Sequence, residues 1–546
     1  MFLNLAAITI TYKIFHHEGS ITNSLNDYAG FSFHYLLLMI ALAVLEPVVE
    51  NLLRFHTSVR WKKFTVKENK LNLCIYVYGF ALALMNFVRI FDNSFWGDEG
   101  YSIRMTHISV ADMISTTASD VHPPLHYLLG QLLYHVLGNS GTTYHLIGLL
   151  PYLVVVILGC SVVRKYFGKI PAVVLITMSS IMNYALTHNV EVRMYSLAAM
   201  FVLIAYIAFY MILTRTSVWC WVAFCVASLG AAYTHYYALI AVAFLYAMLI
   251  PLALKNKKFR VGMLLSYVAT ILAYLPWLLI LVKSFERTAN SWWLESIPTV
   301  RDCVYTLLDN KYILILVLLV ISLFCLYQTN ILKLKVSSEK AIREKIDFYI
   351  DLEKPELTGE LYWVISGLVS IAGTIVVGLA LSYLVRPFLV LRYLFPLTGI
   401  AYLMIGVCIT KLKFPRVWGI ILVLLVLWTH IPTYINTVKS EKSFNTGTSN
   451  YLANVQPAAD EKIITNNSHF NWTLSEYYYP ENVHEYNSDA ITNLNTEDDT
   501  VWLFWEGELD DSAIRSIRKQ HYSVEKIYES NFANTYYRAY KLTRMK

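Results

Sequence analysis

The sequence predicts an α-helical, polytopic membrane protein that carries a small C-terminal α/β domain. Its mean hydropathy is +0.47, and 56% of its 546 residues are hydrophobic while 15% are charged, a composition unlike that of a soluble domain. Apolar runs long enough to cross a hydrocarbon core of about 30 Å recur along the chain and predict about 12–13 transmembrane helices. When these runs alternate across a bilayer, every long basic segment falls on one side, as the positive-inside rule requires.

Residues 1–70 are expected to form the N-terminal membrane segment or segments and a basic loop. Residues 1–15 are apolar but short, so that both a spanning and a non-spanning arrangement stay open, whereas residues 31–53 predict a span. Neither a basic start nor a small-residue cleavage site precedes them, so no cleaved signal peptide is expected. The loop that follows is predicted to be cytoplasmic because it is rich in cations. These are Arg54, Arg60, Lys62, Lys63, Lys67 and Lys70.

Residues 71–435 are predicted to form the main transmembrane domain, and alternation places the long loop 91–143 on the extracytoplasmic face of the plasma membrane. Arg104 is the only Lys or Arg in that loop. The polar segment 332–360 is expected to be a cytoplasmic amphipathic helix. The predicted spans are 71–90, 144–163, 170–186, 194–213, 218–233, 239–254, 261–282, 312–327, 361–385, 394–409 and 417–435.

Residues 436–546 are polar and follow a final outward crossing, so they are predicted to form an extracytoplasmic domain. Runs of β-branched and aromatic residues predict strands at 462–465, 501–505 and 536–542. Residues 512–520 predict a helix, which makes the domain α/β.

Asp98 and Glu99 stand side by side a few residues beyond the apolar run 71–90. Adjacent carboxylates near a low-dielectric bilayer repel each other, so they need a raised pKa, a cation or hydrogen-bond donors. Such a pair can supply a general base or a metal ligand. The alternative is that both acids only favour the first turn of the next helix, where the helix dipole suits them.

The outer loop is expected to contain an interfacial helix at residues 125–137. Its apolar residues form one stripe, and the helix is too short to cross the membrane, so it should lie in the interface plane. Pro123 and Pro124 suit its start. Asp120 and His122 directly precede this helix, so they belong to the same loop as Asp98.

Several short motifs occur in a set order and spacing. They are Asp98-Glu99-Gly100-Tyr101, His122-Pro123-Pro124-Leu125-His126-Tyr127, Glu191-Val192-Arg193-Met194-Tyr195, Thr234-His235-Tyr236, Trp292-Trp293 before Ile297-Pro298, and Arg392-Tyr393-Leu394. In these motifs, residues 71–435 resemble the GT-C membrane glycosyltransferases, in the bacterial branch similar to protein O-mannosyltransferases and aminoarabinose transferases. One departure is His145, where that family usually has an arginine.

The resemblance implies transfer of a sugar from a polyprenyl-phosphate carrier to an extracytoplasmic acceptor, which could be a protein, a lipid or a wall polymer, with inversion at the anomeric carbon. A lipid-phosphate leaving group develops negative charge that needs cations. Arg193, Arg386 and Arg392 are predicted at the outer ends of spans and are the phosphate-binding candidates. The acceptor hydroxyl needs a base, for which Asp98 is the choice, with Glu99 orienting it or binding a cation.

Further substrate-binding candidates come from the same motifs. They are Asp120, His122, Glu191, Tyr195, His235, Trp292 and Trp293. Structural alternatives stay open for several of them: arginines can snorkel to headgroups, Arg193 can pair with Glu191, histidines can be satisfied polar residues, and tryptophans can belong to an aromatic belt. No cofactor is certain, but a divalent cation held by Asp98, Glu99 and His122 is one alternative.

Rival functions remain at the level of sequence. A transporter or flippase of lipid-linked sugars would also have many spans with internal charges, although paired broken repeats and midplane charges would be more typical of it. A sensor or scaffold would not explain the carboxylate pair together with the outer arginines. A surface-polysaccharide polymerase or ligase is closer in class. The expected partners are the lipid-linked sugar, the acceptor and the bilayer, with no nucleic acid.

Overall fold

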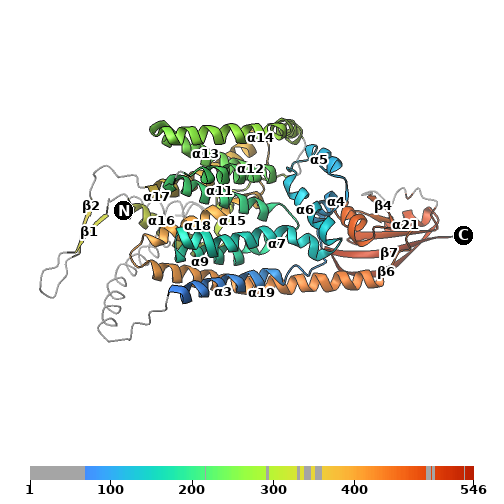
Figure 1. The fold of residues 1–546 in the computed structure, drawn as a ribbon. Helices are drawn as coiled ribbons and strands as arrows, with labels where there is room; N and C mark the ends of the chain where they lie inside the picture. The colour runs from blue at the N-terminus through green and yellow to red at the C-terminus, as the bar shows by residue number, and fades with distance from the viewer. Residues whose placement is uncertain are drawn as a thin grey trace, which may run out of the picture.

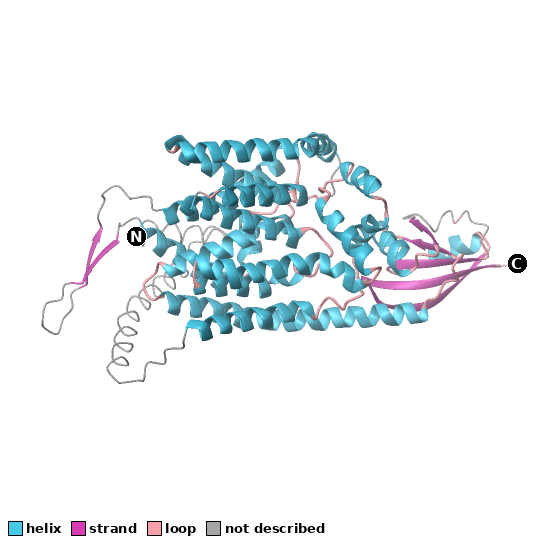
Figure 2. Cartoon of the chain, in the orientation of Figure 1, coloured by secondary structure: helices cyan, strands magenta, loops and turns pink. Residues whose placement is uncertain are grey.

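The computed structural model describes residues 68–215, 217–290, 294–328, 332–336, 346–350, 359–486, 494, 498–533 and 535–545. It consists of a helical bundle, a layer of short helices over one end of that bundle, and a mixed sheet domain beyond them (Figures 1 and 2). The predicted segments 1–15 and 31–53 and nearly all of the basic loop lie outside the described residues, as do Trp292 and Trp293.

The bundle confirms the multi-pass helical architecture. Its helices are α3 (Glu68–Phe87), α7 (Gly141–Leu158), α9 (Lys169–Ile181), α11 (Tyr195–Arg215), α12 (Val218–Thr234), α13 (Tyr236–Lys255), α14 (Lys257–Asn290), α16 (Lys311–Gln328), α17 (Gly359–Leu384), α18 (Thr398–Thr410) and α19 (Pro415–Asn454). Eight helices of the described residues are long and apolar enough to cross a membrane. A ninth span arises if α15 (Val300–Leu308) and α16, which meet at 90°, count as one.

One predicted span ends earlier than the sequence suggested. The run 170–186 divides at Met182, where α9 stops and α10 (Asn183–His188) begins. The backbone N–H of Asn183 donates to Asp309 Oδ2 at 2.8 Å. Asp309 itself lies at the break between α15 and α16, so one carboxylate links two interruptions of the bundle.

The bundle has the arrangement expected of a protein in lipid: its interior is packed, and its exterior is apolar. α11 is central and mostly buried, whereas α14 is mostly exposed. The lipid-facing surface of α14 carries exposed leucines such as Leu265 and Leu272. Such a surface is stable only in a hydrocarbon environment.

The helix expected at 332–360 is a wrong prediction. Its described parts are two strands, β1 (Leu332–Val336) and β2 (Ile346–Ile350), which pair antiparallel, and the first two residues of α17. The alternation Leu-Lys-Leu-Lys-Val in the sequence of β1 has the period of two that is typical of a strand.

The outer loop forms α4 (Gly97–His107), α5 (Val110–Ala118) and α6 (Leu125–Leu137), so the helix predicted at 125–137 is confirmed. Residues on the inner side of α6, including His126 and Gln131, are buried, while Leu132 and Val136 on the apolar stripe are exposed. Gln131 Nε2 donates to the carbonyl oxygen of Met105 at 3.0 Å, which ties α6 to α4.

The C-terminal domain is built on a five-stranded sheet in the order β4-β3-β5-β7-β6. Its elements are β3 (Lys462–Thr465), α20 (Ser468–Thr473), η3 (Leu474–Tyr478), β4 (Val483–Tyr486), β5 (Thr500–Glu506), α21 (Asp511–Lys519), β6 (Tyr522–Phe532) and β7 (Thr535–Arg544). The predicted strands correspond to β3, β5 and β7. α19 runs without interruption through residue 436, where the sequence placed the domain boundary, and on to β6 (Figure 1).

The C-terminal domain sits directly on α4 through α20 and η3. A Cβ atom built on Gly100 would lie 2.0 Å from Thr473 Oγ1 and 2.8 Å from the Thr473 backbone nitrogen. Trp472 packs on Tyr101 with ring centroids 4.9 Å apart. Further along α4, His107 contacts the Glu476 carboxylate at 3.1 Å. The domain therefore holds the whole length of the helix that bears Asp98.

We expect Gly100→Ala to disturb this contact, because the backbone of α20 leaves no room for a methyl group. Overpacking of this kind costs about 1–3 kcal/mol, so the thermal midpoint in detergent should fall and the C-terminal domain should become more sensitive to protease. The matched control is Gly359→Ala at the start of α17, where a Cβ would meet nothing within 4 Å. An unchanged midpoint for Gly100→Ala would show that α20 is not seated on α4.

Candidate active site

Asp98 lies in the first turn of α4 between two arginines from distant parts of the chain. Arg392, in the short helix η2 (Leu391–Leu397), places Nη2 3.0 Å from Asp98 Oδ2. Arg193 precedes α11, and its Nη2 lies 3.9 Å from the same oxygen. Arg193 Nη1 also donates to the Asp98 carbonyl oxygen at 3.0 Å and to Ser102 Oγ at 3.2 Å. Three motifs of the sequence thus meet at one carboxylate.

Glu99 faces away from this cluster and makes backbone contacts. Its Oε1 accepts from the Val192 N–H at 2.9 Å, and its Oε2 accepts from the Trp96 N–H at 3.2 Å. The second contact caps α4, and the first ties α4 to the segment that carries Arg193. Burial, and next the nearby Glu191 carboxylate, raise the pKa of Glu99 well above its ordinary value. The two adjacent acids therefore have different surroundings: Glu99 makes the capping contacts, and Asp98 faces the arginines.

Arg392 is positioned by an aromatic ring as well as by Asp98. Its guanidinium carbon lies 5.4 Å from the centroid of the Trp96 ring, a cation–π contact that the sequence analysis did not anticipate. Arg386 lies half-buried at the start of the segment that leads to η2, whereas the arginines that contact the Asp98 carboxylate are Arg193 and Arg392.

His122 and His235 belong to an aromatic group beside the arginines. Their ring centroids are 6.0 Å apart, and His235 also lies 5.8 Å from Tyr195 and 5.0 Å from Tyr393. Burial, followed by the charge of Arg193, holds the pKa of His122 well below its usual range. A neutral imidazole at this place can exchange hydrogen bonds with a ligand without adding charge.

Asp120 reaches the same region from the loop before α6. The Tyr101 hydroxyl donates a hydrogen bond to its carboxylate, and burial raises the pKa of Asp120 although Arg193 acts in the opposite direction. Tyr101 also packs on Trp472. It therefore connects Asp120 to a residue of the C-terminal domain. Sequence reasoning did not connect Trp472 with the site, because none of the motifs that predicted site residues contains it.

His145, the departure from the family pattern, has a structural role. Its Nδ1 contacts the Val190 carbonyl oxygen at 2.7 Å, and its ring stacks on Phe95 at 5.1 Å. It therefore holds the segment whose Val192 amide binds Glu99. Glu191 contacts His188 Nδ1 at 2.5 Å, whereas Arg193 donates hydrogen bonds to the Asp98 carbonyl oxygen and to Ser102 Oγ.

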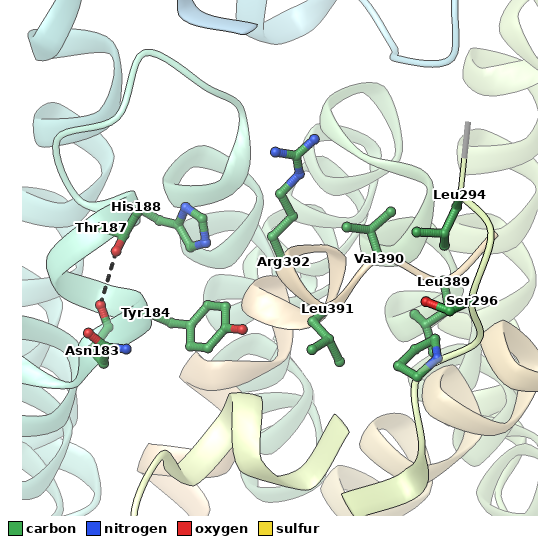
Figure 3. Close-up of a pocket in the computed structure, with 11 residues that line it drawn as sticks. Asn183, Tyr184, Thr187, His188, Leu294, Ser296, Leu389, Val390, Leu391 and Arg392 are labelled. Carbon is green, nitrogen blue, oxygen red and sulfur yellow. Dashed lines mark hydrogen bonds between the residues drawn. The ribbon is translucent and has the colours of Figure 1, made fainter. Parts of the chain in front are cut away.

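A cavity of about 440 Å³ opens beside Arg392 (Figure 3). One wall comes from α10, a second from the segment before α15, and a third from the residues that lead into η2. The lining residues are Asn183, Tyr184, Thr187, His188, Leu294, Ser296, Pro298, Leu389, Val390, Leu391 and Arg392. Of these, only Arg392 was a predicted site residue; Pro298 belongs to one of the quoted motifs, and the others belong to none.

The proposed metal ligands do not form a metal site in the part of the chain that the structure describes. There, no group of three His, Cys, Asp or Glu side chains is placed to hold an ion. Both oxygens of Glu99 are occupied by backbone amides, and the charge of Asp98 is balanced by arginine. In the described structure, Asp98 and Glu99 are therefore engaged with guanidinium and amide groups.

Comparison with known proteins identifies the fold. No protein-family model and no curated protein matches the chain. Among solved structures, it is similar to ArnT from Cupriavidus metallidurans in the apo state, with a TM-score of 0.54 and 11% identity over 86% of this chain and 97% of that one. ArnT bound to undecaprenyl phosphate gives a TM-score of 0.52 and 12% identity over 86% and 97% of the two chains. The GT-C-like fold that the motifs predicted is confirmed.

The environment of Glu99 predicts a pH effect on stability. Its pKa in the folded protein is raised above the ordinary 4.5, so folding favours the neutral acid. That contribution is complete below 4.5 and is lost as the pH rises through the folded value. We therefore expect Glu99→Gln to flatten the fall of the thermal midpoint as the pH rises above 4.5. Glu508→Gln, at an exposed carboxylate, is the control, and parallel curves for wild type and Glu99→Gln would contradict the prediction.

Proposed function

We propose that this protein is an integral-membrane, inverting glycosyltransferase that moves a sugar from a polyprenyl-phosphate carrier to an extracytoplasmic acceptor. The observation that carries the proposal is Asp98, a partly exposed carboxylate placed between Arg193 and Arg392, the second of which lines a cavity. The likeness in fold to ArnT, one structure of which is bound to undecaprenyl phosphate, supports it.

The arginines suit a lipid phosphate. The Nε atoms of Arg193 and Arg392 are buried and make no hydrogen bond within the described residues. A buried donor without a partner is costly, and an arginine fork pairs well with phosphate oxygens. A phosphate arriving beside Arg392 would compete with Asp98 for its guanidinium, so binding of the donor would also release the carboxylate.

The reaction then needs one base and one stabilised leaving group. The Asp98 carboxylate accepts the proton of the acceptor hydroxyl while that oxygen attacks the anomeric carbon of the sugar. The bond from this carbon to the phosphate oxygen breaks, and its electron pair leaves with the lipid phosphate. Arg193 and Arg392 stabilise the charge that develops there. Direct displacement inverts the anomeric configuration, and the proton returns from Asp98 to solvent.

The distribution of cations supports an extracytoplasmic site. The end of the bundle opposite Asp98 carries a set of basic residues at the helix turns. These are Arg164, Lys165, Lys169, Arg215, Lys411, Lys413 and Arg416. By the positive-inside rule this end faces the cytoplasm, and α4 and the C-terminal domain are then outside.

Substitutions at Asp98 and Arg392 should affect different steps: the first should lower transfer of the sugar, and the second should weaken binding of the lipid. We expect Asp98→Asn to lower transfer from undecaprenyl-phosphate-linked sugars to membrane extract by about 100-fold or more, since a general base contributes that much, while binding of undecaprenyl phosphate persists. Arg392→Ala should weaken that binding by about 10- to 100-fold, because it removes charged hydrogen bonds. Radiolabelled lipid and isolated membrane protein allow both measurements.

Lys411→Ala is the control for the weaker lipid binding of Arg392→Ala. It also removes a cation, but at the end of the bundle opposite Asp98, where Lys411 pairs with Glu360. Full transfer by Asp98→Asn would remove Asp98 from catalysis. Binding of the lipid without transfer by the wild type, over a panel of donors, would favour a transporter of lipid-linked sugars.

Transfer should also survive treatment with a chelator. The arginines provide the positive charge that a divalent cation would otherwise supply. The Glu99 carboxylate accepts hydrogen bonds from backbone amides, and the Asp98 carboxylate contacts a guanidinium group. The measurement is the transfer rate of the wild type with and without excess EDTA. A loss that added Mg²⁺ or Mn²⁺ restores would show that a metal takes part.

A further inference from the structure

His188 and Glu191 form a buried pair on the wall of the cavity, outside the residues that the proposed reaction uses. His188 Nδ1 lies 2.5 Å from Glu191 Oε2, and their side chains are 4% and 7% exposed. His188 lines the cavity from α10, on the side opposite Leu294 and Ser296, and Arg392 stands between (Figure 3).

The hydrogen bond to Glu191 assigns the tautomer of His188. A carboxylate accepts hydrogen bonds and does not donate them, so the proton of the neutral imidazole is on Nδ1 and the lone pair is on Nε2. The Nε2 atom is buried and has no hydrogen-bond partner within the described residues. A buried acceptor held in place by a second residue and left without a donor indicates a ligand that brings one.

The rest of the cavity indicates what this ligand is. Asn183, Tyr184 and Thr187 continue the polar wall beside His188, while Leu389 and Pro298 make the facing wall apolar. A volume of about 440 Å³ lies in the range of small-molecule sites. A hydroxyl-bearing ring has both a polar edge and an apolar face, and so fits between two such walls.

We propose that this cavity holds the sugar of the lipid-linked donor and that His188 determines donor specificity by accepting a hydrogen bond from a sugar hydroxyl. Glu191 is a positioning residue that acts through His188. The inference rests on the proposed function, since it places the sugar next to the arginine that would bind the lipid phosphate.

Binding of two kinds of lipid tests this assignment. The probes are bare undecaprenyl phosphate and undecaprenyl phosphate bearing glucose, mannose or arabinose, measured with detergent-purified full-length protein. The wild type should bind at least one sugar-bearing lipid more tightly than the bare lipid. His188→Ala should weaken binding of that lipid by about 3- to 10-fold, the effect of one hydrogen bond, and leave bare lipid unchanged.

Two further variants exclude a purely structural effect. His188→Gln keeps an acceptor oxygen, so it should retain part of the preference for the sugar-bearing lipid. If His188→Ala does not fold, His188→Gln takes its place in the binding measurement. Asn189→Ala is the matched control, because Asn189 is buried beside His188 but donates to the Ser179 carbonyl oxygen and does not line this cavity. It should lower the thermal midpoint without changing the ratio of the two affinities.

Failure of the proposed function and failure of the sugar-cavity assignment give different binding results. If the wild type binds no undecaprenyl phosphate, the proposed function falls and this inference with it. If it binds bare lipid but prefers no sugar-bearing lipid, or if His188→Ala weakens both lipids equally or neither, only the assignment of the sugar cavity is overturned. Arg392→Ala, which should weaken both lipids, shows the pattern expected from loss of the phosphate contact.

Discussion

The contact of Asp98 with Arg392 and Arg193 is the constraint around which this end of the molecule is arranged. Guanidinium groups at the edge of a low-dielectric bundle need a negative partner, and one carboxylate cannot saturate two of them. The arrangement is therefore stable enough to fold and still has donors to offer to an anion. Arg193 uses the carbonyl oxygen of Asp98 and Ser102 as additional acceptors, which fixes its direction.

Each of the three segments that meet there is held from outside the cluster. α4 is tied to the Arg193 segment by the bond from Val192 to Glu99, and that segment is held in turn by His145. The C-terminal domain packs against α4 through α20, so a domain far along the sequence supports the helix that bears Asp98. Because many contacts fix the position of α4, a small change in any of them should shift the Asp98 carboxylate.

The cavity beside Arg392 shows how a membrane protein can place polar groups at the end of a bundle. α10 begins where α9 breaks at Met182, and the break turns the polar side chains of α10 toward the cavity rather than toward lipid. The Asn183 amide freed at this break is taken up by Asp309. Irregular backbone near a bilayer is tolerated where it is buried in protein or lines a cavity, and both conditions hold here.

Hydropathy, charge and short motifs were sufficient to predict the helical bundle, the helix at 125–137 and the GT-C-like fold, because these depend on local composition and periodicity. The meeting of Asp98 with Arg193 and Arg392 was anticipated only as residues on one face. Sequence chose Asp98 rather than Glu99 as the base, but it did not predict the backbone contacts of Glu99, and it did not identify His188 or Trp472 as neighbours of the site. Those depend on which side of a helix faces which neighbour, and contacts between residues hundreds of positions apart are decided only when the chain packs.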